Sequence, residues 1–246
     1  MLKRTFDILA SATGLIVLSP LFLAIAVWIK LDSRGPVFYR GKRAGRGGNP
    51  FELFKFRSMV AGADKIGGPT TSGDDLRATR SGRFIRRFKL DELPQLINVL
   101  RGEMSLVGPR PEVVDKVARF DGVARRALDV RPGMTDWASI WNSDEGGVLA
   151  GAPDPDAAYE RVLYPHKLRL QLYYLETRSF LTDLKIVFYT VMKIFRRRWV
   201  PKPLRKFPAF EELRAQVQRW VAEHEQAGSR EGDTSAGGKS LSESRP

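Results

Sequence analysis

Two adjacent acids, Asp91 and Glu92, stand among basic residues in the stretch "RFKLDELPQLINVLRGEMSLVGPRP". Arg86 lies shortly before them, and Arg110 follows in "GPRP", where the fixed φ of the two prolines limits where its guanidinium points. Arginine matches the oxygens of phosphate, and cations beside a carboxylate keep it ionised, as a nucleophile must be. The stretch therefore permits phosphoryl transfer with Asp91 as the attacking group.

A metal ion fits the same pair of acids. A carboxylate that approaches a phosphate normally needs a divalent cation to relieve the repulsion, and hard oxygen ligands favour Mg²⁺. Asp91 and Glu92 are therefore the candidate ligands of Mg²⁺ as well as the candidate catalytic pair. A solvated basic face would have a similar local composition, so the residues alone permit this chemistry without requiring it.

The acids also suit a simpler role at the start of a helix, because Asp is a favoured N-cap and Glu in a first turn interacts well with the helix dipole. Apolar residues at helical spacing predict a helix over residues 90–100 that begins at the acids: Leu93, Leu96, Ile97 and Leu100. Pro94 has no amide hydrogen for a cap at Asp91 to accept, which weakens the simple capping role. Adjacent helical positions diverge, so the two acids are expected to perform different tasks, unlike the facing carboxylates of a glycosidase.

Composition narrows the classes of function. The chain has 246 residues, 43% of them hydrophobic, which is enough for a core and for one or two domains. Its 41 Lys and Arg against 28 Asp and Glu give a net charge of +13, which attracts nucleic acid, anionic lipid headgroups or phosphorylated small molecules. The absence of cysteine excludes disulfides, thiolate nucleophiles, iron–sulfur clusters and the usual zinc sites. His166 and His224 are too few for a histidine-rich metal site, and a Ser-His-Asp triad is disfavoured.

An uncharged run of 22 residues, "ILASATGLIVLSPLFLAIAVWI", separates Asp7 from Lys30 and is long enough to cross a bilayer. A secretory signal peptide is disfavoured, because Asp7 lies where that region should be purely basic. Basic residues flank both ends, so a spanning helix would place one basic cluster on the wrong side of the membrane. Pro20 favours a bend at Ser19-Pro20, where the serine hydroxyl can bond a freed carbonyl. The residues alone leave two alternatives, a kinked spanning helix and a re-entrant segment.

The region after this run predicts a β-hairpin. Residues 36–40 and 51–59 have the composition of two short strands. The loop between them, "GKRAGRGGNP", is rich in glycine but has neither the Walker spacing nor the order Gly-x-Gly-x-x-Gly. We therefore interpret it as a hairpin loop and not as a nucleotide-binding motif.

The second half of the chain is predicted to be mostly helical. Apolar periodicity predicts three helices, over residues 155–177 with an interruption near Pro165, over 180–199 and over 208–226. Basic residues beside Trp199 suit a helix that lies on an anionic membrane, although cations at the end of a core helix would look the same. Together with the hairpin, these helices predict a mainly helical α+β fold.

Five stretches of the chain follow one another from about Lys3 to Phe195: "KRTFDILASATGLIVLSPLFL", "GPVFYRGKRAGRGGNPFELFKFRSM", "SGRFIRRFKLDELPQLINVLRGEMSLVGPRPE", "VRPGMTDWASI" and "LQLYYLETRSFLTDLKIVFYTVMKIF". In content and order they resemble the bacterial sugar transferases of the monotopic phosphoglycosyl transferase superfamily. The central block is long and specific, so it carries most of the resemblance.

The resemblance implies that a sugar 1-phosphate passes from a UDP-sugar to a polyprenyl phosphate, such as undecaprenyl phosphate, in the assembly of exopolysaccharide or glycoconjugates. It implies that Asp91 attacks to form a covalent phosphosugar intermediate, that Glu92 supports it through metal or proton handling, and that Mg²⁺ is the cofactor. The resemblance does not imply nucleic acid as a partner. The substrate-binding candidates that the resemblance adds are Lys55, Arg86, Arg110 and, less closely, Arg131.

The resemblance also implies an organisation of the chain. It places a re-entrant helix-break-helix at residues 1–34, bent at Ser19-Pro20, on the cytoplasmic face of the bacterial inner membrane. A catalytic domain with the hairpin and interfacial amphipathic helices would occupy residues 35–200. A further amphipathic helix at 201–226 and a disordered tail at 227–246 would complete the chain.

Residues 135–147, "TDWASIWNSDEGG", depart from the pattern of many relatives, which continue with Gly-Trp-Ala-Gln. This segment bears on which sugar is transferred, so the identity of the sugar stays open. The alternative from another class is a non-catalytic, membrane-anchored basic protein that binds anionic lipid or nucleic acid.

Overall fold

The computed structural model of the chain describes residues 1–68, 70–120, 122–196 and 199–237, with side-chain surroundings described up to Glu223. The chain divides into two compact units. The first comprises Met1–Pro69, Asp75–Ser143 and His166–Phe207, and the second comprises Thr70–Asp74, Asp144–Pro165 and Pro208–Pro246. This division differs from the predicted one, because two segments inside the expected catalytic domain at 35–200 belong with the C-terminal helix.

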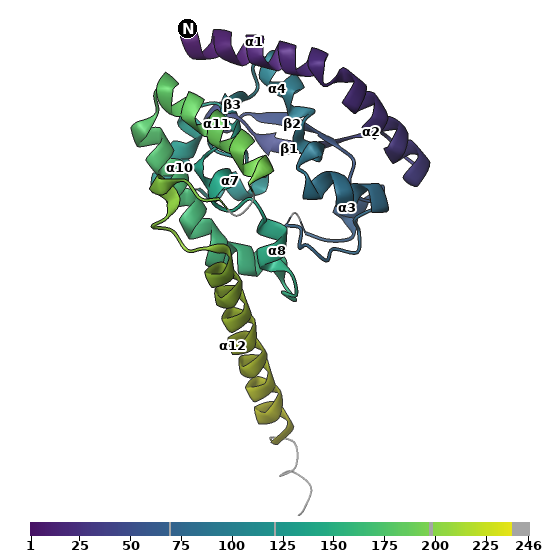
Figure 1. Cartoon of the computed structure of the whole chain (residues 1–246). Coiled ribbons are helices and arrows are strands. Elements are labelled where there is room, and N and C mark those ends of the chain that lie inside the picture. Colours follow the sequence, from purple (N-terminus) through teal and green to yellow (C-terminus); the bar gives the residue numbers. More distant parts are fainter. Residues whose placement is uncertain (69, 121, 197–198, 238–246) are drawn as a thin grey trace, which may run out of the picture. The chain divides into compact units, whose positions relative to one another are not determined.

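The elements are mainly helices (Figure 1): α1 (Leu2–Val17), α2 (Ser19–Asp32), α3 (Arg80–Arg87), α4 (Gln95–Arg101), α5 (Val114–Val117), α6 (Gly122–Arg125), α7 (Trp137–Trp141), α8 (Glu145–Leu149), α9 (Pro155–Ala158), α10 (Tyr164–Thr177), α11 (Phe180–Phe195) and α12 (Phe210–Gly237). The strands are β1 (Phe38–Ala44), β2 (Pro50–Phe56), β3 (Ser105–Val107) and β4 (Gly133–Thr135). Single turns are η1 (Arg46–Gly48), η2 (Ala63–Lys65), η3 (Leu90–Glu92), η4 (Arg126–Asp129), η6 (Lys202–Leu204) and the π turn η5 (Tyr159–Leu163). The predicted mainly helical fold with one antiparallel hairpin is confirmed, and the short parallel pair β3–β4 is an addition.

A broken helix forms the N-terminus (Figure 1). α1 and α2 meet at Leu18 and are bent by 60° to each other. Pro20 lies in the first turn of α2, and Ser19 Oγ donates a hydrogen bond of 2.8 Å to the carbonyl of Ile16. The predicted bend and the predicted role of the serine hydroxyl are therefore confirmed. Among the described helices none is by itself long and apolar enough to cross a membrane, whereas α1 and α2 as a bent pair have sufficient length and apolar character.

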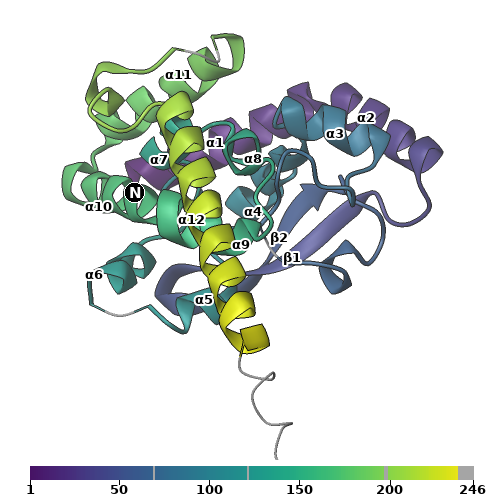
Figure 2. The ribbon, with the colours of Figure 1, turned by 90° about the horizontal axis from the view of Figure 1, so that it is seen from below.

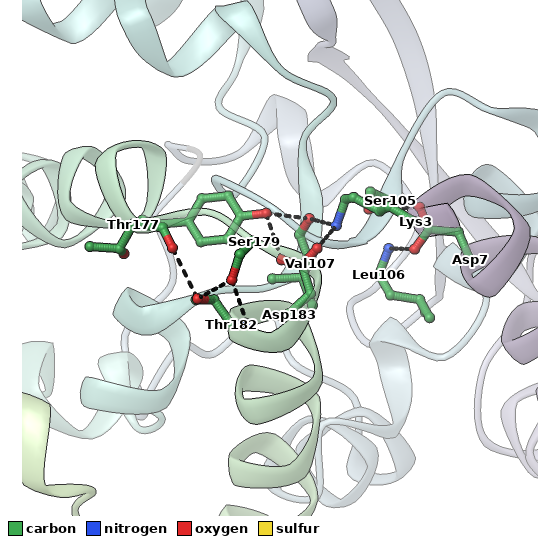
Figure 3. A network of polar contacts seen from close by, with 10 residues as sticks. Lys3, Asp7, Ser105, Leu106, Val107, Thr177, Ser179, Thr182 and Asp183 are labelled. Atoms are coloured by element: carbon green, nitrogen blue, oxygen red, sulfur yellow. Dashed lines mark hydrogen bonds and ion pairs between the residues drawn. The ribbon is translucent and has the colours of Figure 1, made fainter. Parts of the chain in front are cut away.

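Charged side chains at the start of α1 attach it to β3 and α11 (Figure 3). Lys3 Nζ donates to Asp183 Oδ2 over 2.7 Å and to the carbonyl of Val107 over 3.0 Å. Asp7 is buried although it lies in an apolar helix. It accepts hydrogen bonds from Ser105 Oγ at 2.8 Å and from the backbone amide of Leu106 at 3.1 Å. The broken helix is therefore attached to the strand that leads into the GPRP turn.

Part of α2 belongs to the hydrophobic core of the first unit. Ile25 and Ile29 are almost fully buried and pack in one cluster with Phe56 of β2 and Ile85 of α3. Leu23, Val27 and Leu31 are exposed on the opposite side of α2, and the exposed Leu21 and Trp28 lie at the edge of the packed side. α2 therefore contacts protein on one side and leaves an apolar face uncovered on the other.

β1 and β2 form the predicted antiparallel hairpin, and Figure 2 shows the two strands side by side. The register pairs Phe38 with Phe56 at the open end of the hairpin. Both strands extend into the predicted loop, because the turn itself needs only a few residues around Gly47 and Gly48. These glycines have φ of 71° and 82°, a region that favours residues without a side chain.

The predicted helix at 155–177 is present with its interruption. The π turn η5 separates α9 from α10 and ends two residues before Pro165, which lacks the amide hydrogen that a regular helix would use there. α12 begins at Phe210 and continues to Gly237, beyond the predicted end at 226 and into the tail predicted to be disordered. Residues 238–246 of that tail lie outside the described part of the chain.

α11 is amphipathic, as predicted, but ends at Phe195, before the predicted end at 199. Trp199 turns back on the helix, because its ring meets Tyr189 edge-on at 5.3 Å and its carbonyl accepts a hydrogen bond of 2.9 Å from Lys193. Arg197 and Arg198, two of the basic residues expected beside Trp199, lie outside the described residues. One side of the helix is buried at Ile186, and large apolar side chains are exposed on the rest: Leu181, Phe188, Val191, Ile194 and Phe195.

Candidate active site

The acid pair lies on the single 3₁₀ turn η3, ahead of α4. The prediction that a helix begins at the acids is wrong, since α4 begins at Gln95 and neither acid caps it. A helix starting at Leu90 would need the amide hydrogen of residue 94 for its first bond, and Pro94 has none. The chain closes a tighter turn instead, in which the amide of Leu93 donates to the carbonyl of Leu90 at 3.2 Å.

Lys89 turns the chain into η3 with φ of 57°, and it is the one non-glycine residue with positive φ among those described. This left-handed conformation costs roughly 1–2 kcal/mol for a residue with a side chain. Its carbonyl accepts the amide of Glu92 at 3.3 Å, which fixes the start of the turn. Strained residues of this kind are common at functional sites. The sequence analysis missed Lys89, because nothing in its neighbours signals a positive φ.

Glu92 is held by two cations from distant segments. Arg110, which follows β3, donates to Oε2 through Nη1 at 3.1 Å and to Oε1 through Nη2, so the guanidinium grips both oxygens. Lys55 of β2 donates to Oε1 at 3.0 Å. Burial raises the pKa of Glu92, but the charges of Arg110 and Lys55 outweigh burial and hold this pKa well below its usual range. Glu92 is therefore ionised and its oxygens are engaged.

Asp91 has the opposite environment. The residue is 7% exposed, and Oδ1 has no hydrogen-bond partner within the described part of the chain. Burial raises the pKa of Asp91, and the attraction of Lys55 opposes this rise only in part. One neighbouring carboxyl is thus saturated with donors while the other has an oxygen that no protein group satisfies. This contrast supports the expectation that the two acids perform different tasks.

The remaining predicted residues separate into two groups. Arg86, in the last turn of α3, lies close enough for its charge to oppose the burial-driven rise in the pKa of Asp91. Lys55, Arg86 and Arg110 therefore converge on the acid pair. Arg131 does not share a described contact with the acids; its Nε donates to the carbonyl of Gly102 at 2.8 Å, at the far end of α4. Its role toward a substrate stays a prediction.

Asp136, in the divergent segment 135–147, is a second residue that the sequence analysis missed. It is fully buried, and Oδ1 caps α7 by accepting the amide of Ser139 at 2.7 Å. Oδ2 has no partner among the described residues. Burial raises the pKa of Asp136, against the charges of Lys167 and Arg110. Arg110 therefore lies within the electrostatic reach of a third carboxyl, and the departure from the family pattern was the signal that pointed there.

The acid pair fits Mg²⁺ in one respect. Across the described residues, no three acidic or histidine side chains gather as a ready metal cluster. Mg²⁺ usually needs only one or two carboxylates, because substrate phosphates and waters complete its shell. The unsatisfied Oδ1 of Asp91 suits this role, whereas Glu92 would have to share oxygens that Arg110 and Lys55 already bind. Asp91 is thus the better placed of the two predicted ligands.

The sequence of the chain matches a known protein family. The model of the bacterial sugar transferase family matches residues 1–197. UDP-N-acetylgalactosamine-undecaprenyl-phosphate N-acetylgalactosaminephosphotransferase of Aeromonas hydrophila is 40% identical over 196 residues, which cover 78% of this chain and 43% of the relative. Undecaprenyl-phosphate glucose phosphotransferase of Komagataeibacter xylinus is 43% identical over 205 residues, which cover 79% of this chain and 36% of the relative.

A relative of similar length is exopolysaccharide production protein ExoY of Sinorhizobium fredii, 37% identical over 204 residues, with 77% of this chain and 83% of the relative covered. The chain thus spans less than half of the first two relatives, at 43% and 36% of their lengths, and most of the third. Because the family match covers most of the chain, including the acid pair and every residue that surrounds it, the chain belongs to the bacterial sugar transferase family.

Proposed function

We propose that the chain transfers a sugar 1-phosphate from a UDP-sugar to undecaprenyl phosphate, at an early membrane step of surface polysaccharide or glycoconjugate assembly. The observation that carries the proposal is the buried Asp91 with an unsatisfied oxygen, beside a Glu92 that two cations already neutralise. The relatives' names support the acceptor, since two of them specify phosphotransfer to undecaprenyl phosphate. Four of the relatives' names, each from a different bacterium, specify a UDP-linked donor.

The proposed reaction has two displacements at one phosphorus atom. First, a carboxylate oxygen of Asp91 attacks the sugar-bearing phosphorus of the UDP-sugar, the bond to the bridging oxygen breaks, and its electron pair leaves with UMP. An oxygen of the lipid phosphate then attacks the same phosphorus. The bond to Asp91 breaks, which restores the carboxylate and forms a polyprenyl diphosphate sugar.

The surrounding residues supply charge and position. Glu92 stays ionised and fixes the guanidinium of Arg110 and the ammonium of Lys55 next to Asp91. Arginine has five donors and lysine three, which is more than one carboxylate uses, so these cations also suit the oxygens of a diphosphate. Glu92 is therefore a positioning residue in this proposal, and its saturated oxygens argue against a role in proton transfer. Mg²⁺ held mainly by Asp91 would neutralise the charge that develops on the phosphate oxygens.

The proposed location is the cytoplasmic face of the bacterial inner membrane, with α1 and α2 as a re-entrant segment. A soluble nucleotide sugar and a lipid phosphate can meet only at the membrane surface. The exposed apolar faces of α2 and α11 and the net charge of +13 support such a position, because both favour an anionic lipid surface. The bend of 60° between α1 and α2 supports a return to the same face.

The test uses the purified full chain in detergent with Mg²⁺. A panel of radiolabelled UDP-sugars is offered with undecaprenyl phosphate, and intact-protein mass spectrometry after UDP-sugar alone searches for a phosphosugar adduct. Asp91→Asn is expected to abolish both adduct and turnover, whereas Asp115→Asn, a matched change at an exposed aspartate of α5, keeps both. Folded protein that transfers no sugar and forms no adduct would refute the proposal in favour of a non-catalytic binding protein.

A further inference from the structure

Three aromatic side chains form a row that starts on α2 and continues along α3. The ring centroids of Trp28 and Phe84 are 5.2 Å apart, and those of Phe84 and Phe88 are 4.8 Å apart. Phe84 lies on α3 and Phe88 directly follows its last residue, so the two rings, four positions apart in sequence, lie on one side at the end of the helix. The row therefore connects the broken N-terminal helix to the end of α3.

The end of the row lies close to the reacting carboxyl. Phe88 precedes Asp91 by three residues, which limits the separation of their backbones to about 11 Å. The turn at Lys89 lies between them, and its charge, like that of Arg86, acts on Asp91. The apolar row therefore ends within about 11 Å, measured along the backbone, of the proposed nucleophile and the cations that act on it.

The row is open to ligands. Trp28, Phe84 and Phe88 keep 37%, 46% and 40% of their surface exposed, which is high for large aromatic side chains that already touch one another. An apolar strip that leads to a cationic end matches an amphiphile with an apolar chain and an anionic head. A nucleotide sugar has no such chain, so the donor substrate does not explain the row.

We infer that this row binds the first isoprene units of the polyprenyl phosphate acceptor and guides its phosphate to Asp91. The inference rests on the proposed function and assigns the acceptor chain a site of its own. Two observations favour this occupant over a bulk membrane lipid. The row begins on α2, where a chain leaving a bilayer would arrive, and it ends at Phe88, three residues before Asp91, the group that the acceptor phosphate must reach. The flat faces of the rings suit the branched, unsaturated chain of a polyprenol.

The two-step reaction separates this site from the donor site. The phosphosugar adduct is first formed with UDP-sugar alone, and its discharge is then followed by mass spectrometry as a polyprenyl phosphate is titrated in. Phe84→Ala removes the central ring, and the acceptor concentration for half-maximal discharge is expected to rise about tenfold. Adduct formation should change by less than about twofold, because Asp91 and its cations are untouched. Phe84→Leu keeps apolar bulk for the packing of α3 and is expected to raise the same concentration about threefold.

Phe188→Ala is the matched control. It removes an exposed phenylalanine from α11, whose described ring neighbour is Tyr189, and discharge should stay at the level of the unsubstituted protein. Equal weakening by Phe84→Ala and Phe188→Ala would overturn the inference, since both rings would then serve only to seat the protein on lipid. Unchanged discharge in Phe84→Ala and Phe84→Leu would overturn it as well. An unsubstituted protein that forms no adduct and transfers no sugar would instead refute the proposed function, and the inference with it.

Discussion

Replacement of Asp91 by asparagine is expected to stabilise the fold at neutral pH while it removes the reaction. Burial raises the pKa of this carboxyl above its ordinary value of 3.8, so the folded chain binds the proton more tightly than the unfolded chain does. Stability therefore falls as pH rises between the unfolded and the folded pKa, and above both values the full cost of ionising the buried group is present. Asparagine has nearly the same shape and carries no charge.

The size of the effect follows from the unsatisfied Oδ1 of Asp91. A buried polar group without a partner costs about 1–3 kcal/mol, and the neutral amide keeps part of that cost. A gain of about 1 kcal/mol is therefore expected at pH 7.5, which corresponds to about 2–4 °C in Tm for a chain of this length. The gain should shrink as the pH falls toward 3.8, where half of the unfolded carboxyl is protonated, and its ionisation part should vanish below that pH.

The assay is a urea titration in detergent without divalent cations, followed by the fluorescence of the five tryptophans. Glu92→Gln is the control with the opposite sign. The pKa of Glu92 is held below its ordinary 4.5 by Arg110 and Lys55 against the effect of burial, so its contribution is present above 4.5 and is lost as the pH falls through the folded pKa. Glu92→Gln removes the charge that pairs with both cations, so the free energy of unfolding should fall by about 2–3 kcal/mol at pH 7.5. A loss of stability in Asp91→Asn at pH 7.5, or shifts of the same sign in both variants, would refute the reasoning.

Three further predictions address the surroundings of the site. Arg110→Lys keeps the charge but loses the two-point grip on Glu92, so adduct formation should slow about tenfold, and an unchanged rate would contradict the positioning role. Asp183→Asn leaves the ammonium of Lys3 without its charged partner. Because that ammonium is partly exposed, the free energy of unfolding should fall by about 1 kcal/mol or less. The loss should be smaller at high salt, which screens the ion pair. Replacing Ser19 and Pro20 by alanine permits a straight helix across the break. The probe is a cysteine placed at the first residue of this cysteine-free chain. In intact cells this cysteine should react with an impermeant thiol reagent in the alanine variant and stay protected in the protein with the native bend.

Features that depend on local chemistry were predictable from the sequence. The hairpin followed from a glycine-rich loop between two apolar strands, and the break between α1 and α2 followed from Pro20. The hydroxyl of Ser19 bonds a carbonyl of the preceding turn, as expected of a serine at a helix break. Each of these features depends on residues close together in the chain, so their types and spacing carry enough information.

Features that depend on distant partners were not predictable from spacing. Lys3 and Asp183 are 180 positions apart, and nothing in either neighbourhood announces their ion pair. Arg110 was expected near the acids, but its grip on both oxygens of Glu92 depends on how β3 is placed beside η3. The start of α4 was misjudged for a local reason, because the missing amide of Pro94 was weighed as a weak cap and not as the lost first bond of the helix.

The way in which α1 and α2 are built into the first unit limits how the chain can be handled. Ile25 and Ile29 close the cluster that contains Phe56 and Ile85, and Asp7 bonds the strand ahead of Arg110. A version shortened to remove α1 and α2 would therefore expose the hydrophobic cluster of the first unit and release one support of the GPRP turn. Removal of these two helices would therefore destabilise the folded unit itself. If the segment lies in the bilayer as proposed, substitutions that adapt it to another membrane would also change the packing of α2 on α3, which carries Arg86, and would act on turnover as well.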